Sequence, residues 1–464
     1  MTFNLASHVL GAGRARPDHP ALIVPGVLSL DHAGLLRAVE ARAGGLRARG
    51  LPEGARVLLR LGNVPDFPIT FLAACAAGLV PVPTSAQLTV PEITAMAARV
   101  APSVVVAGPG IAVPDGTRPV APAELDGAPL PVEDWTPGDP NRLAYIVFTS
   151  GSGGMPKAVA HAHRAILARR MMHDGWYGLR PDDRMLHAGA FNWTYTLGTG
   201  LMDPWSVGGT AIIPADGTPV EALPGLIASE GATLFAAAPG VYRRLLRGDW
   251  PGAPALRHGL SAGERLLPAL REDWRRVTGT DVHEALGMSE CSTFISGSPA
   301  RPAPEGSSGY PQPGRRIRIH DGRLQVATDD PGLMLGYWED GAPVPPGGAW
   351  FDTGDRVRLL EDGAVVHEGR QDDLLNPGGY RISPQEVEAA LAELPVAELA
   401  VGCVEVAGGA SVLAVFYVGP PLDEGLANAH AAARLARYKQ PRLWLRRDAL
   451  PRNANGKLIR RALA

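Results

Sequence analysis

The feature that most constrains the fold of this chain is a repeated alternation of helical and short apolar segments. A helical pattern at 35–49 precedes an apolar strand at 56–61. A second helical pattern at 67–77 precedes an extended segment at 79–83. Short apolar segments of the same kind recur at 103–107, 144–149, 184–188, 210–214 and 232–236. Such alternation predicts an α/β fold in which parallel sheets are covered by helices.

Beyond about residue 310 the pattern favours antiparallel strands. The dipeptides at 321–322 and 362–363 are both Asp-Gly, and each separates two short segments. Asp-Gly tolerates the positive φ of a two-residue turn, so both positions predict β-hairpins. One helix, two strands and a second helix are predicted to follow, the first three at 384–394, 399–406 and 411–418.

Length and charge limit the class of protein. The 464 residues suffice for two or three domains. Basic and acidic side chains nearly balance, 44 against 47, which gives no support for a nucleic-acid partner. No apolar stretch is long enough to cross a bilayer, the N-terminal sequence lacks a signal-peptide pattern, and the three cysteines lack metal-ligand spacing. We therefore expect a cytoplasmic protein that binds neither nucleic acid nor membranes.

An apolar strand at 145–148 runs directly into a loop rich in glycine and serine. The residues of this loop are Thr149, Ser150, Gly151, Ser152, Gly153, Gly154, Met155, Pro156 and Lys157. Glycines let successive backbone N–H groups converge on an anion, hydroxyls add donors, and the lysine adds a positive charge. The spacing fits neither the Walker loop nor the dinucleotide GxGxxG pattern. A flexible turn with an incidental lysine is the alternative, but only three of the 44 basic residues are lysines, and this scarcity favours a phosphate loop.

This loop resembles that of the adenylate-forming superfamily, which includes acyl-CoA synthetases, aryl-CoA ligases and peptide-synthetase adenylation domains. The family usually has TSGSTGxPKG, and here Gly153 replaces the second threonine and Ala158 the final glycine. Further segments resemble family motifs in the same order along the chain. They lie at 286–290, 350–355, 369–373, 379–388, 438–441 and 451–457.

The resemblance implies a domain organisation and a reaction. We expect an N-terminal AMP-binding domain of α/β sheets with an appended β region at 1–369, a hinge at 370–372 that pivots at Asp372, and a small mobile α+β C-terminal domain at 373–464. A carboxylate would attack the α-phosphorus of ATP to give acyl-AMP and pyrophosphate, and a thiol would then displace AMP. The implied cofactors are ATP, Mg²⁺ and coenzyme A. An enzyme that loads a carrier-protein thiol and a non-catalytic acyl or nucleotide sensor are the alternatives.

The resemblance also assigns roles to single residues. Glu290 is the candidate Mg²⁺ ligand, since a hard carboxylate suits this ion. Lys457 is the candidate catalytic cation, which would bridge the acyl carboxylate and the α-phosphate. The other candidate nucleotide-binding residues, besides the loop from Thr149 to Lys157, are Gly263, Glu264, Ala285, Leu286, Gly287, Met288, Ser289, Asp355 and Arg370. The candidate coenzyme A contacts are Gly378, Gly379, Tyr380, Arg381 and Arg442.

The resemblance places the carboxylic acid substrate among three segments of the chain. The candidate substrate-binding residues are Trp193, Thr194, Tyr195, Ala238, Gly240, Thr293 and Phe294. The segment 191–195 contains no carboxylate that would pair with an α-amino group, which argues against an amino-acid substrate. Aromatic and small residues instead favour an aryl or short-to-medium acyl acid. His161 and His163 lack a third ligand, so we expect them at the start of a helix rather than in a metal site.

Overall fold

The structure is a computed structural model that describes residues 3–149, 156–370, 375, 377, 382–406, 410–435, 437–453 and 456–464. The chain divides into two compact units. Unit 1 comprises 1–316 and 327–350, and unit 2 comprises 317–326 and 351–464. In this division residues 351–369 group with the C-terminal segment, whereas the resemblance predicts a boundary at residue 369, which stays a prediction.

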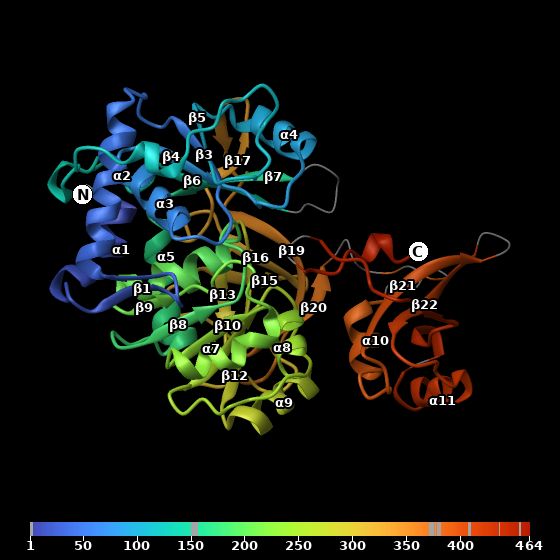
Figure 1. Cartoon of the computed structure of the whole chain (residues 1–464). Helices are drawn as coiled ribbons and strands as arrows, with labels where there is room; N and C mark the ends of the chain where they lie inside the picture. Colours follow the sequence, from blue (N-terminus) through green and yellow to red (C-terminus); the bar gives the residue numbers. More distant parts are fainter. Residues whose placement is uncertain are drawn as a thin grey trace. The chain divides into compact units, whose positions relative to one another are not determined.

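The largest sheet of unit 1 has nine strands (Figure 1). In spatial order they are β14 (Tyr310–Pro311), β13 (Ser292–Ser296), β12 (Asp281–Met288), β11 (His258–Ala262), β10 (Leu234–Ala237), β8 (Arg184–His187), β9 (Thr210–Ile212), β1 (Pro20–Val24) and β2 (Leu28–Asp31). Strands β12, β11, β10, β8, β9 and β1 run parallel to one another, and antiparallel pairs occur only at the two ends. The central parallel order is the arrangement that the alternating pattern predicts.

Both faces of the nine-stranded sheet are buried. Successive side chains of a strand point to opposite faces. Phe235 of β10 accordingly packs into a cluster with Tyr242 and Trp274, whereas its neighbours Leu234 and Ala236 pack with residues of the opposite layer. One layer contains α7 (Leu223–Ser229), α8 (Pro239–Leu245) and α9 (Pro268–Thr278), and the other contains α5 (Ala165–Met172) and the π-helix η4 (His173–Tyr177).

A second, three-stranded parallel sheet lies in the N-terminal part of unit 1. Its order is β4-β3-β5, with bounds Val80–Pro83, Arg56–Arg60 and Val104–Ala107. Three helices accompany these strands: α2 (His32–Ala48), α3 (Asp66–Ala76) and α4 (Val90–Val100). The sequence pattern predicted α2, α3 and all three strands to within a few residues.

The third sheet of unit 1 corrects two expectations. Its order is β18-β17-β7-β6, with bounds Ala342–Val344, Gly336–Glu339, Lys157–Ala162 and Leu143–Thr149. The prediction that 144–149 belongs to a parallel sheet is wrong, because the segment after the loop is itself a strand that returns antiparallel to β6. The prediction of His161 at a helix start is wrong for the same reason, since His161 lies within β7 and α5 begins at Ala165.

Unit 2 contains a four-stranded sheet of order β15-β16-β19-β20, with bounds Ile317–His320, Arg323–Ala327, Trp350–Leu359 and Val365–Arg370. Both predicted hairpins are present. Asp321 and Gly322 have φ of 50° and 71°, as a two-residue turn between β15 and β16 requires. The second turn is longer than predicted. The peptide N–H of Leu360 donates to the carbonyl of Ala364, which leaves three residues in the loop.

The C-terminal part of unit 2 contains a three-stranded sheet and two helices. The strands are β21 (Glu398–Val406), β22 (Ala410–Val418) and β23 (Leu443–Arg446), and the helices are α10 (Pro384–Ala390) and α11 (Glu424–Arg434). Val387 of α10 and Ala427 of α11 pack with Val401 and Val415 of the sheet. The remaining helices are α1 (Leu5–Gly11), α6 (Asp203–Ser206), the π-helix η5 (Thr196–Met202) and the 3₁₀ turns at 12–15, 122–125, 132–134, 220–222, 437–439 and 460–462. Among the described residues, no helix is long and apolar enough to cross a membrane.

Candidate functional site

Glu290 lies at the tip of the β12–β13 hairpin. Met288 pairs with Ser292 at the end of the ladder, so residues 289–291 form the connection. The two strands approach closely at Gly287, where a Cβ atom would lie 2.6 Å from the carbonyl oxygen of Ser292. Ser292 itself has φ of 59°, the left-handed conformation that usually falls to glycine or asparagine at this position of a hairpin. The carboxylate of Glu290 is thus carried on a short, closely paired turn.

The Glu290 carboxylate is held by a tyrosine from another sheet. The phenol of Tyr337, on β17, donates to Glu290 Oε1 at 2.9 Å, and the Glu290 residue is 8% exposed. The ammonium group of Lys157, on the neighbouring strand β7, lies 4.6 Å from the centroid of the Tyr337 ring. A cation over an aromatic face is attracted by the ring. The lysine that ends the predicted phosphate loop and the predicted metal ligand therefore contact the same tyrosine.

The backbone of the hairpin turn is also held from outside. The Nε2 atom of His161 lies 2.8 Å from the carbonyl oxygen of Ser289. A carbonyl only accepts, so this nitrogen carries the proton. Burial lowers the pKa of His161 to about 4, and the ring, stacked on Tyr145, is neutral at pH 7. On the other side, the N–H of Met334 donates to the carbonyl of Glu290 at 2.7 Å.

Glu290 fits a magnesium site of the kind in which a nucleotide supplies most of the ligands. Among the residues that the structure describes, no group of three His, Cys, Asp or Glu side chains is close enough to enclose a metal. Mg²⁺ is commonly held by one or two carboxylates together with substrate phosphates and water. A single, mostly buried carboxylate with one oxygen already oriented by Tyr337 meets that requirement.

Two of the predicted nucleotide-binding segments of unit 1 meet at one edge of the nine-stranded sheet. Ala262, at the end of β11, pairs with Ala285 of the parallel strand β12. Gly263 and Glu264 therefore directly follow the end of β11. The neighbouring end of β12 and the residue after it comprise Ala285, Leu286, Gly287, Met288 and Ser289. The carboxyl ends of strands are where open α/β sheets bind ligands.

The predicted phosphate loop connects two antiparallel strands. Thr149 pairs directly with Lys157 across β6 and β7. Ser150, Gly151, Ser152, Gly153 and Gly154 lie outside the described residues. Their phosphate-binding role stays a prediction.

Trp193 and Tyr195 form the aromatic part of the predicted acid pocket. Their rings meet edge to face, with centroids 5.2 Å apart. The Tyr195 hydroxyl donates to the carbonyl of Leu260 at 3.0 Å, and burial raises the pKa of Tyr195 well above its usual value. Trp193 lies on the backbone of Gly263, where φ is 97° and a Cβ would come within 2.7 Å of the indole. A candidate substrate residue and a candidate nucleotide residue are thus in contact.

The other predicted pocket residues differ in their surroundings. Thr194 and Ala238 are partly buried, and a Cβ at Gly240 would meet nothing within 4 Å, so there is open space beside it. The Thr293 hydroxyl is directed at the sulfur of Met172. Phe294 is 1% exposed and packs in the interior of unit 1. The substrate-binding roles of these residues stay predictions.

In unit 2, the two predicted ribose contacts lie opposite each other in the ladder. Asp355 of β19 pairs with Arg370 of β20. Asp355 Oδ1 also lies 3.1 Å from Nε2 of His367, a residue that the sequence did not single out. Burial alone would raise the pKa of Asp355, but His367, Arg370 and the Thr353 hydroxyl together hold this pKa below its usual value. The carboxylate is therefore ionised at neutral pH.

Lys457 lies in an exposed loop close to the C-terminus. Its backbone N–H donates to the Asn453 side chain at 2.9 Å, and its side chain is exposed. Arg442 is exposed as well, whereas Lys439 forms an ion pair with Glu386. The predicted hinge residue and four of the predicted coenzyme A contacts lie outside the described residues: Asp372, Gly378, Gly379, Tyr380 and Arg381.

Comparisons with known proteins bear on the family and the fold of this chain. The profile of the family described as AMP-binding enzyme matches residues 11–338. The chain is 29% identical to the 3-hydroxybenzoate–CoA ligase of Aromatoleum sp. (strain CIB), over 98% of this chain and 95% of that protein. It is 30% identical to the benzoate–CoA ligase of Thauera aromatica, over 89% and 86%. The crystal structure of ATP-bound MatB from Rhodopseudomonas palustris matches with a TM-score of 0.90 and 25% identity, over 100% of this chain and 98% of that one.

The chain therefore belongs to the family of AMP-binding enzymes. Within that family it resembles acid–CoA ligases over nearly its whole length. The predicted membership, the α/β fold class and the class of AMP-forming acid–thiol ligase are confirmed by these matches, and ATP binding is supported by the family and by the ATP-bound structure.

Proposed function

We propose that this enzyme activates an aryl carboxylic acid with ATP and transfers the acyl group to coenzyme A. In the first step the acid attacks the α-phosphorus of ATP, which gives acyl-AMP and pyrophosphate. In the second step the thiol of coenzyme A attacks the acyl carbon, which gives the thioester and AMP. The observation that carries this proposal is the likeness to two benzoate-type CoA ligases along nearly the whole chain, unit 2 included.

The surroundings of the candidate pocket support an aryl substrate. The edge-to-face pair of Trp193 and Tyr195 supplies a rigid aromatic wall, and aromatic rings favour such offset and edge-on contacts with one another. Gly240 leaves open space on the α8 side. The relatives act on benzoate and 3-hydroxybenzoate according to their names, so we assign a benzoate-sized acid to this chain.

Glu290 is proposed to hold Mg²⁺ together with the phosphates of ATP. The bound ion would neutralise phosphate charge, which is the usual contribution of a metal to phosphoryl and nucleotidyl chemistry. The protein's own part is to orient the carboxylate through the Tyr337 hydroxyl and to keep Lys157 close by, over the ring of the same tyrosine.

Unit 2 is proposed to bind the ribose and to supply the catalytic cation. Asp355 is ionised at pH 7 and has two oxygens that accept hydroxyl hydrogens. His367 lies within hydrogen-bonding distance of the carboxylate, and the positive charge of Arg370 favours its ionised form. Lys457 is proposed to reach the acyl carboxylate and the α-phosphate during adenylation, and Arg442 is the described residue assigned to coenzyme A.

Acid-dependent exchange of labelled pyrophosphate into ATP tests the first half-reaction. The panel would contain benzoate, 3-hydroxybenzoate, 4-hydroxybenzoate, acetate, octanoate and phenylalanine. We expect exchange with the aryl acids and none with phenylalanine. Mass spectrometry would then detect the thioester when coenzyme A is added. Exchange with none of the aryl acids would overturn the proposal, and product only with a carrier protein would reassign the acceptor.

A further inference from the structure

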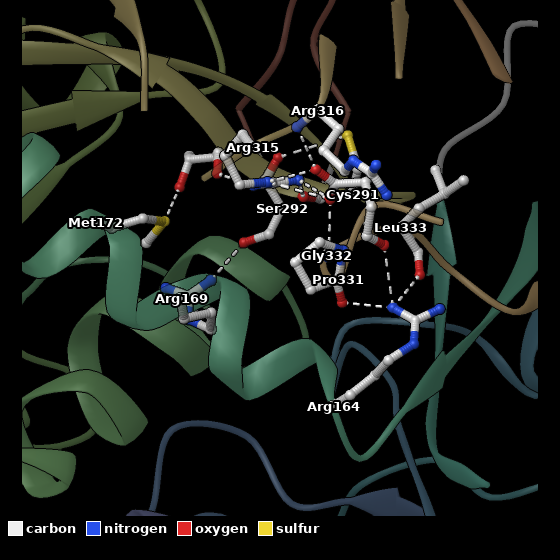
Figure 2. Close-up of polar contacts among 12 residues, drawn as sticks. Arg164, Arg169, Met172, Cys291, Ser292, Arg315, Arg316, Pro331, Gly332 and Leu333 are labelled. Atoms are coloured by element: carbon white, nitrogen blue, oxygen red, sulfur yellow. Dashed lines mark hydrogen bonds and ion pairs between the residues drawn. The ribbon is translucent and has the colours of Figure 1, made fainter. Parts of the chain in front are cut away.

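Two buried arginines hold the segment that directly follows Glu290. Arg169 and Arg315 contact residues 291–293 from different elements, and Figure 2 shows Arg169 directed at Ser292. Arg315 comes from the segment before β15, and Arg169 comes from α5. With His161 and Met334 already bound to the carbonyls of Ser289 and Glu290, every residue from 289 to 293 has a hydrogen bond or polar contact to another part of unit 1.

Arg315 fixes the two carbonyls that flank Ser292. Its guanidinium donates to the carbonyl of Cys291 at 2.9 Å and to that of Thr293 at 2.7 Å. The positive charge is compensated by Asp330 at 2.9 Å, and both side chains are fully buried. A buried charge pair of this kind is costly unless all its hydrogen bonds are satisfied, so its geometry is strongly constrained.

Arg169 fixes the side chain of Ser292. Its Nη1 atom donates to Ser292 Oγ at 2.6 Å. The same guanidinium forms a two-pronged ion pair with Asp203, at 2.9 Å from Nε and 2.6 Å from Nη2. It also lies directly against Gly198 of η5, where a Cβ would come within 1.9 Å of the guanidinium carbon. Arg169 thus connects η5, which follows the Trp193–Tyr195 segment, to the turn that carries Glu290.

We propose that Ser292 and Arg169 are positioning residues for the metal-binding carboxylate, acting through their hydrogen bond on the backbone next to Glu290. This inference rests on the proposed role of Glu290. Neither side chain is assigned to a reacting atom. Ser292 occupies a left-handed position that glycine would fill without strain, and its hydroxyl is what a glycine would not supply.

Two substitutions of Ser292 separate the effect of its hydroxyl from the effect of its left-handed backbone conformation. Ser292→Ala removes the hydrogen bond and keeps the left-handed strain. Ser292→Gly removes the hydrogen bond and relieves that strain. Ser296→Ala is the matched control, because Ser296 lies on the same strand and donates its hydroxyl to the carbonyl of Gly175 at 2.7 Å, away from the turn.

The measurement is the affinity of the full-length protein for ATP by calorimetry, once with Mg²⁺ and once with EDTA. We expect the preference for MgATP over metal-free ATP to fall roughly fivefold or more in S292A and S292G. S296A should keep the wild-type preference. S292G should unfold at a higher temperature than S292A, because the glycine relieves the backbone strain. Both variants should nevertheless lose the preference for MgATP.

Several results would overturn the proposal. If S292G keeps the wild-type preference, Ser292 serves only a backbone conformation. If S296A loses the preference equally, any lost buried hydroxyl has the same effect. Arg169→Lys keeps a charge opposite Asp203 but not the two-pronged geometry. It should reproduce the loss, and combining it with S292G should add nothing further; additive losses would show that the two residues act separately.

The calorimetric test does not depend on which carboxylic acid is the substrate. ATP binding is measured without any carboxylic acid, so absence of pyrophosphate exchange with aryl acids would overturn the proposed function and leave this comparison readable. If the wild type itself shows no preference for MgATP, the role of Glu290 as metal ligand is wrong, and the positioning role is wrong with it.

Discussion

The orientation of the Glu290 carboxylate depends on the hydrogen bond that it accepts from the Tyr337 hydroxyl. Tyr337→Phe removes the 2.9 Å hydrogen bond but keeps the ring that Lys157 contacts. A hydrogen bond to a charged group contributes about 1.5–3 kcal/mol. We therefore expect the Mg²⁺ concentration for half-maximal pyrophosphate exchange to rise about tenfold. An unchanged Mg²⁺ requirement would contradict the assignment. Tyr337→Leu also removes the ring. The difference between Tyr337→Phe and Tyr337→Leu therefore measures the contribution of the contact between this ring and Lys157.

Lys457→Ala tests whether this lysine acts in adenylation and not in thioester formation. Its side chain is exposed in this structure, so Lys457→Ala should leave the free energy of unfolding nearly unchanged. Removal of a preorganised catalytic donor costs about 3–4 kcal/mol in the barrier, a rate loss of two orders of magnitude or more. We expect that loss in pyrophosphate exchange, and little loss in thioester formation from synthetic acyl-AMP. Equal losses in both assays would rule out the assigned role.

At the scale of single elements, glycines divide into those with room for a side chain and those without. Gly225 lies in α7 and a Cβ there would meet nothing within 4 Å. Gly225→Ala should therefore raise the free energy of unfolding by about 0.5–1 kcal/mol, because alanine loses less backbone entropy in a helix. Gly198, on η5, has no such room beside Arg169. Gly198→Ala should be destabilising by about 1–3 kcal/mol, the usual cost of overpacking. Urea denaturation measures both, and equal effects would contradict the packing argument.

Elements set by local pattern were predictable from the sequence, and contacts between distant elements were not. Strands such as β3 and helices such as α3 follow from apolar periodicity, and the Asp-Gly pair at 321–322 correctly predicts a hairpin. The antiparallel return of β7 was missed, because periodicity does not specify which strand pairs with which. Tyr337 was missed for a similar reason. It lies 47 residues from Glu290 in the sequence, and nothing in a Gly-Tyr-Trp run indicates a metal site.

Within the site, residues such as Glu290 and Asp355 were recognised by resemblance, whereas the residues that contact them were not foreseen. Asp355 and Glu290 stand in motifs, but His367 and Ser292 carry no recognisable spacing. Their importance comes from register and from backbone conformation, which become visible only when β19 is paired with β20 and β12 with β13.

For the molecule as a whole, buried histidines set the response to acid. Burial lowers the pKa of nine described histidines. The largest shifts bring the pKa to about 4 for His161 and His283 and to about 3 for His163, His187 and His258. In the unfolded chain these histidines become protonated as the pH falls through about 6.5. In the folded chain they stay neutral until the pH approaches their lowered pKa. The contribution of these histidines to the free energy of unfolding is therefore fully present above pH 6.5 and is lost as the pH drops toward 4, by about 1.4 kcal/mol per pH unit for each residue.

His187→Phe tests this acid response. The ring packs edge-on against Tyr195, and neither of its nitrogens has a hydrogen-bond partner in the described part of the chain. Phenylalanine keeps the aromatic contact and cannot be protonated. Relative to the wild type, the variant should gain about 2 kcal/mol in free energy of unfolding between pH 8 and pH 5. Parallel pH profiles for the two proteins would contradict the assignment. Urea denaturation at each pH gives the measurement.

The different surroundings of the three lysines have a practical consequence for chemical labelling. Lys157 and Lys457 are both exposed, although Lys157 lies over the ring of Tyr337, and Lys439 is paired with Glu386. An amine-reactive fluorophore used at low excess would therefore modify Lys157 and Lys457 ahead of Lys439, and in a Lys157→Arg variant it would modify Lys457 first. A dye placed on Lys457 would report, through its emission, whether the surroundings of the C-terminal segment change when nucleotide, acid and coenzyme A are added in turn.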